Sequence, residues 1–174
     1  MSNFIANQSE CDQLIAKTSS VFISDSQKTL LKDWIQLYNS DTRRLPARAD
    51  FPPPHYHVHM PSAVIFEVMD EPLDFKYRLF GTIVANHSTA DFTGKLLSSL
   101  PGKGPDSGIW KMLNSTKENK IPLFREVPYV GPHSDFIRST VLFLPMASDH
   151  KNPDRIFLIA NFISKNLLSE NGEF

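Results

Sequence analysis

The sequence predicts an α+β fold in which a five-stranded antiparallel sheet packs against helices. Stretches with strand-like alternation or β-branched content come first as a pair, at 63–69 and 75–79. Three further stretches of this kind follow, at 123–130, 136–146 and 155–163. Short helical segments separate the pair from these three. Strands joined by short turns pair antiparallel, so we expect one sheet with the short helices packed on one face and an N-terminal helix that caps the fold.

The clearest helix begins after Ser24. Ser24 followed three residues later by Gln27 has the pattern of a capping box. Five apolar side chains then recur at helical spacing and form one face. They are Leu30, Leu31, Trp34, Leu37 and Tyr38. This face either covers the sheet or forms the seam of a homodimer.

Prolines mark where regular structure stops. Five of them between residues 45 and 61 exclude a continuous helix or a central strand there. Pro128 makes the strand at 123–130 an edge strand.

Three further helical segments are expected after the first pair of strands. They lie at 83–87, as a single turn at 91–97, and after a cap at Asp106 or Ser107. In this last helix, one face carries Ile109, Trp110, Met112, Leu113 and Thr116.

The length of 174 residues fits one domain at 25–166, with an N-terminal extension at 1–24 and a C-terminal tail at 167–174. A short helix at 12–17 would fit the extension.

With 18 basic and 19 acidic residues, the chain is nearly neutral and has no electrostatic field that would attract nucleic acid or anionic lipid. Cys11 is the single cysteine, which excludes an internal disulfide. We find no signal peptide or membrane span and expect a cytoplasmic protein.

Three histidines at alternate positions, His55, His57 and His59, form the sharpest chemical motif. On a strand they would share one face and could hold zinc or iron. The run lies between prolines and has no carboxylate or cysteine nearby, so we favour a polar surface segment and expect no metal site. No serine, cysteine or paired-carboxylate arrangement indicates catalysis, and we expect no enzyme.

Four short motifs follow one another between residues 34 and 97. They are Trp34, Leu-Pro-x-Arg-x-Asp at 45–50, Tyr-Arg-Leu-x-Gly-Thr at 77–82 and Thr-Gly at 93–94. In this order they resemble a bacterial, proteobacterial branch of the stand-alone PAS sensor domains. The resemblance implies a sheet whose second and third strands lie at the edges. It also implies helices that enclose a ligand cavity, and a sensing function without catalysis.

The same resemblance disfavours two common PAS cofactors, and the cofactor stays unknown. A flavin photoreceptor needs a reactive cysteine after the second strand, whereas Cys11 lies far upstream. Haem-binding members commonly use a histidine on the long helix, and residues 107–119 contain none. The expected partners are a small-molecule ligand, a second copy of the chain and a separate signalling protein. The alternatives are a ligand-free interaction domain or, less favoured, a metal protein.

Six residues are candidates for ligand binding, each with ordinary core packing or solvent exposure as the alternative. They are Tyr77, Arg78, His87, Phe92, Trp110 and Met112. Arg78 would attract an anion if it lay beside a helix start at Gly81 and Thr82. Arg48 and Asp50 either anchor an anionic ligand or, as we favour, hold the connector in place.

Overall fold

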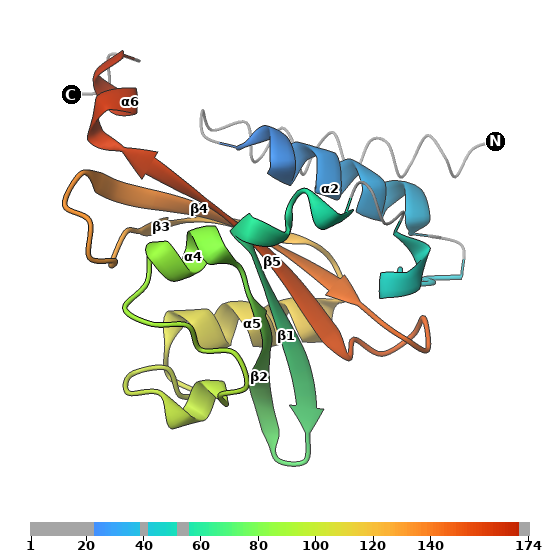
Figure 1. The fold of residues 1–174 in the computed structure, drawn as a ribbon. Helices are drawn as coiled ribbons and strands as arrows, with labels where there is room; N and C mark the ends of the chain where they lie inside the picture. Colours follow the sequence, from blue (N-terminus) through green and yellow to red (C-terminus); the bar gives the residue numbers. More distant parts are fainter. Residues whose placement is uncertain (1–22, 39–41, 52–55, 171–174) are drawn as a thin grey trace.

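The structure, a computed structural model, describes residues 23–38, 42–51 and 56–170 (Figure 1). Its helices are α2 (Asp25–Leu37), α4 (Thr82–Asn86), α5 (Gly108–Asn119) and α6 (Lys165–Glu170). Its strands are β1 (Ala63–Asp70), β2 (Leu73–Phe80), β3 (Leu123–Pro128), β4 (Phe136–Met146) and β5 (Arg155–Ser164). Short 3₁₀ turns lie at Arg48–Asp50, Met60–Ser62 and Leu97–Ser99. Within the described ranges, no helix is long and apolar enough to cross a membrane.

The five strands form one antiparallel sheet in the order β2-β1-β5-β4-β3. This confirms the predicted architecture, including β2 and β3 at the two edges. Pro128 is the last residue of edge strand β3, opposite Arg138. Proline has no N–H to donate to a neighbouring strand, which suits this position.

Strands β4 and β5 are buried on both faces of the sheet. Alternate residues of β4 and β5 belong to two separate hydrophobic clusters, and Figure 1 shows α2 on one side of the sheet and α5 on the other. Leu142 and Ile159 pack in the cluster that contains α2, whereas Val141 and Leu158 pack in the one that contains α5. Two-sided burial explains why the central strands are almost continuous apolar runs.

Helix α2 covers the sheet with its predicted apolar face. Leu30, Leu31 and Trp34 are buried, and Leu37 and Tyr38 are half-buried against the same cluster. The Trp34 indole donates a hydrogen bond to the carbonyl of residue 145 over 2.7 Å. These side chains lie inside the protomer. Within this chain the face therefore covers the sheet, which is the first of the two alternatives.

Gln27 joins the start of α2 to the central strands. Its side-chain oxygen accepts the Ser24 backbone N–H at 3.0 Å, which completes the predicted capping box. Its amide nitrogen donates to the carbonyls of Thr140 at 3.0 Å and Ile159 at 3.1 Å. The Thr140 hydroxyl also donates to the side-chain oxygen, at 3.2 Å. Every hydrogen-bonding position of this fully buried amide is used.

The connector before β1 is held by the residues predicted to hold it. The Asp50 carboxylate accepts the Ala47 N–H over 2.8 Å and lies 3.6 Å from the Arg44 guanidinium. The Arg48 guanidinium lies 3.7 Å above the ring centroid of Tyr56. Arg48 and Asp50 are thus placed in structural contacts, although not with each other.

Gly81, which ends the second predicted strand, is required by close packing. A Cβ there would lie 2.3, 2.4 and 2.7 Å from the carbonyl oxygens of Met60, Pro61 and Ala63. Because three backbone oxygens cannot all move away, only glycine lets the chain turn from β2 into α4 at this point.

Three local expectations differ from the structure. The helical turn predicted at 91–97 occupies only Leu97–Ser99, because the Asp91 carboxylate accepts the Thr93 N–H in a turn instead. The expected tail contains most of α6. The helix predicted at 12–17 lies outside the described residues.

Replacing Gln27 with alanine should lower the free energy of unfolding by about 2–4 kcal/mol, because buried carbonyls and a cap are left without partners. Gln36→Ala, on the exposed face of the same helix, is the matched control and should be nearly neutral. Urea denaturation measures both. Equal stability of the two variants would contradict the role of this amide.

Candidate functional site

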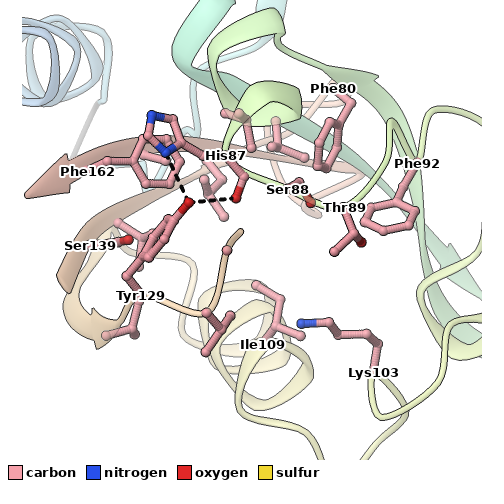
Figure 2. A pocket seen from close by; sticks show the side chains of 18 of the residues that line it. Phe80, His87, Ser88, Thr89, Phe92, Lys103, Ile109, Tyr129, Ser139 and Phe162 are labelled. Carbon is pink, nitrogen blue, oxygen red and sulfur yellow. Dashed lines mark hydrogen bonds between the residues drawn. The ribbon is translucent and has the colours of Figure 1, made fainter. Parts of the chain in front are cut away.

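A pocket of about 390 Å³ lies between the sheet and the segments that follow β2 (Figure 2). All five strands contribute to its lining, together with α4, the segment after it, residue 103, the start of α5 and the β3–β4 loop. Val141 and Ala160 form part of its floor on the two central strands. Its volume falls in the range of about 300–1,000 Å³ that is usual for small-molecule sites.

Three aromatic rings form one wall of the pocket. Tyr77, Phe80 and Phe92 contact one another, with ring centroids 5.5 Å apart for Tyr77–Phe80 and Phe80–Phe92 and 5.7 Å apart for Tyr77–Phe92. Burial raises the pKa of the Tyr77 phenol to about 12, so this side chain stays neutral. The wall offers an apolar surface that suits a ring or an alkyl chain.

His87, at the end of α4, lies on another side of the pocket (Figure 2). Its ring stacks on Phe162 of β5, with centroids 3.9 Å apart. Its Nδ1 lies 3.2 Å from the Tyr129 hydroxyl, which accepts the backbone N–H of His133 over 3.3 Å. The His133 imidazole donates from Nε2 to the carbonyl of Asn86 over 2.7 Å. These bonds join the β3–β4 loop to the end of α4.

The pKa of His87 is lowered from its ordinary value. Burial disfavours the charged imidazolium, and a positive charge on the neighbouring His133 would disfavour it further. At neutral pH, His87 is therefore a neutral ring that stacks on Phe162 and presents one nitrogen to Tyr129.

Of the six candidate residues, Tyr77, His87 and Phe92 line the pocket together. Arg78 is exposed on edge strand β2, in the outward position that alternation with Tyr77 implies. Trp110 is buried and packs edge-on against Phe75, with ring centroids 5.2 Å apart. Met112 packs against the same cluster, and neither it nor Trp110 lines the pocket. Ligand contact by the three lining residues stays a prediction.

Other lining residues were not among the sequence-based candidates. Tyr129 and Phe162 reach the pocket because the β3–β4 loop and β5 meet beside α4, and no local pattern signals this meeting. Lys103 lies in a Pro-Gly-Lys-Gly-Pro segment whose composition indicates a loop but not the direction of the lysine.

The histidine motif does not have the strand geometry that a metal site would need. His57 lies in a helical turn and is exposed, and the backbone at His59 is also helical, with φ −95° and ψ −10°. His55 lies outside the described residues. The described part of the chain contains no group of three His, Cys, Asp or Glu side chains that could hold a metal ion.

The lowered pKa of His87 predicts a loss of stability in mild acid. The unfolded chain takes up a proton near the ordinary histidine pKa, whereas the folded chain does so only at lower pH. The stabilisation is therefore complete above the ordinary pKa and is lost as the pH falls through the lowered pKa of the folded chain. The thermal unfolding midpoint should therefore fall from about pH 8 to about pH 5, and fall less in His87→Phe, which keeps a stacking ring.

The control for this experiment is His57→Gln, which alters an exposed histidine. It should keep the pH dependence of the wild type. An unchanged pH dependence in His87→Phe would contradict the assignment to His87.

Comparison with protein-family models agrees with this architecture. A family model described as PAS domain matches residues 22–160, which is most of the chain. A similar solved structure is a sensory box sensor histidine kinase from Vibrio cholerae, with 10% identity and a TM-score of 0.46 over 63% of this chain and 87% of that one. A search of the curated proteins gives no significant match. PAS domains are generally non-catalytic sensory modules of signal transduction. With the match over residues 22–160, the chain belongs to the PAS domain family.

Proposed function

We propose that this chain is a non-catalytic PAS sensor of bacterial signalling, acting in the cytoplasm, that binds a small molecule between the sheet and the α4–α5 side. The observation that carries the proposal is the pocket itself. It has the size of a metabolite site, an aromatic wall and hydrogen-bonding groups on the other sides. Its described lining contains no carboxylate or thiol, which supports binding rather than catalysis.

The position of the pocket suggests how its state reaches α2. Val141 and Ala160 contribute to the pocket floor, and Leu142 and Ile159 beside them face α2. The carbonyl of Ile159 also accepts a hydrogen bond from Gln27. A ligand that shifts the central strands therefore acts on backbone atoms that hold the start of α2. Occupancy favours one packing of α2 when the ligand binds better to that state.

The output of such a sensor is a change in protein contacts. The apolar face of α2 is used within the protomer, so a partner would contact surface that changes when α2 moves. We propose either a second copy of the chain or a separate signalling protein as this partner. In both cases ligand occupancy changes the affinity of the sensor for this partner by favouring one conformation of the sensor.

Native mass spectrometry paired with denaturing mass spectrometry, on protein purified without a His-tag, tests the proposal. We expect a bound species of small-molecule mass that is lost on denaturation. It should be absent from Ala160→Phe, which fills the floor of the pocket, and present in Ala49→Phe, which places the same side chain on the exposed connector.

An apo mass in all three proteins, followed by no thermal shift with a broad metabolite panel, would contradict ligand sensing and favour a ligand-free interaction domain. The native spectrum also reports whether the protein is a dimer, and comparison with ligand-stripped protein tests whether occupancy alters assembly.

A further inference from the structure

We infer that the ligand of this pocket is an organic anion, with its acidic group at Lys103 and an apolar body against the aromatic wall. The inference rests on the proposed function, since it concerns the chemistry of the molecule that the sensor binds. The side chain that carries the inference is Lys103, whose backbone is held by two successive turns.

The chain places Lys103 at the pocket through a defined turn. Leu100, Pro101, Gly102 and Lys103 form a β-turn in which the Lys103 N–H donates to the carbonyl of Leu100 over 3.1 Å. Proline second and glycine third, the latter with φ +70°, are the residues of a type II turn. A second turn follows, in which the N–H of Ser107 donates to the carbonyl of Gly104 over 2.9 Å. The proline- and glycine-rich segment therefore has a defined backbone conformation.

The Lys103 ammonium is directed into the pocket. Figure 2 shows its nitrogen turned toward the pocket, on the side opposite His87 and Phe162. Lys103 is half-buried, and no described side chain or carbonyl forms a hydrogen bond or ion pair with its ammonium. The described lining contains no acidic side chain, and His87 is neutral at neutral pH. Among the described lining residues, Lys103 therefore carries a positive charge that no acidic side chain balances.

A cation at the side of an apolar pocket selects for an anion. Electrostatic attraction is stronger there than in water, because the surrounding side chains exclude solvent and lower the effective dielectric constant. A carboxylate, sulfonate or phosphate would also accept charge-assisted hydrogen bonds from the ammonium. An inorganic anion alone would leave the aromatic wall unused, so the ligand needs an apolar part as well.

The aromatic wall by itself would also suit a quaternary ammonium group, because aromatic faces attract cations. Lys103 argues against such a ligand, since like charges inside a pocket repel each other. Ser88, Thr89 and Ser139 add hydroxyl groups to the lining. These groups can orient a polar substituent but carry no charge that would offset Lys103.

Two probes that differ by one acidic group test the inference. Anilinonaphthalene sulfonate and the neutral N-phenylnaphthylamine share the same aromatic body, and both fluoresce more strongly in an apolar site. Titrations with ligand-stripped wild-type protein should give about tenfold tighter binding of the sulfonate, the size expected for one hydrogen-bonded charge pair. Lys103→Gln should remove this preference and leave the affinity for the neutral probe unchanged.

Two control variants locate the effect. Lys111→Gln removes an exposed lysine on α5 and should keep the preference for the sulfonate. Ala160→Phe should abolish binding of both probes, and Ala160→Leu replaces it if the larger side chain prevents folding. Added salt should weaken the sulfonate more than the neutral probe.

Equal affinity of the two probes, with binding abolished by the Ala160 variant, would overturn the inference and leave the proposed ligand pocket intact. The inference would also be overturned if Lys103→Gln kept the sulfonate preference. Binding that survives the Ala160 variant would place the probes elsewhere on the surface. That result would contradict both the anion site and the pocket on which the proposed function rests.

Discussion

The buried side-chain amide of Gln27 is the contact on which the arrangement of the two layers depends. A buried amide is costly unless each of its polar positions is paired, and all four are paired here with Ser24, Thr140 and Ile159. Because these partners belong to the helix start and both central strands, the amide fixes the position of α2 over the sheet. Other residues of the same two strands form part of the pocket floor on the opposite face. The fold therefore connects its two sides through one pair of strands.

Most of the architecture could be predicted because its signals are local. The capping box at Ser24 and Gln27 marks a helix start through hydrogen bonds within four residues. Alternation in β2 assigns Tyr77 inward and Arg78 outward, and Pro128 can end a strand only where no neighbour needs its N–H. The steric role of Gly81 was not predictable, because the carbonyl oxygens that crowd it come from the end of the connector and the start of β1, about twenty residues upstream.

The pocket was only partly predictable because it depends on contacts between distant segments. Helical periodicity correctly indicates that Trp110 is buried, but it does not distinguish core packing from a cavity wall. Phe162 reaches His87 through the register of β5 and the position of α4, neither of which is encoded locally. For Lys103 the turn residues are readable, whereas the direction of the side chain depends on where α5 begins against the sheet.

Transmission from the pocket to α2 is tested most directly by the side-chain amide resonances of Gln27, followed in nitrogen–proton correlation spectra while anilinonaphthalene sulfonate is added. Gln27 lies on the face opposite the pocket, so direct contact with the probe is excluded. We predict that these resonances shift at the same probe concentrations as the backbone amides of Val141 and Ile109, which line the pocket, and stay unchanged in Ala160→Phe. Shifts at Val141 and Ile109 with an unchanged Gln27 would contradict transmission through the sheet.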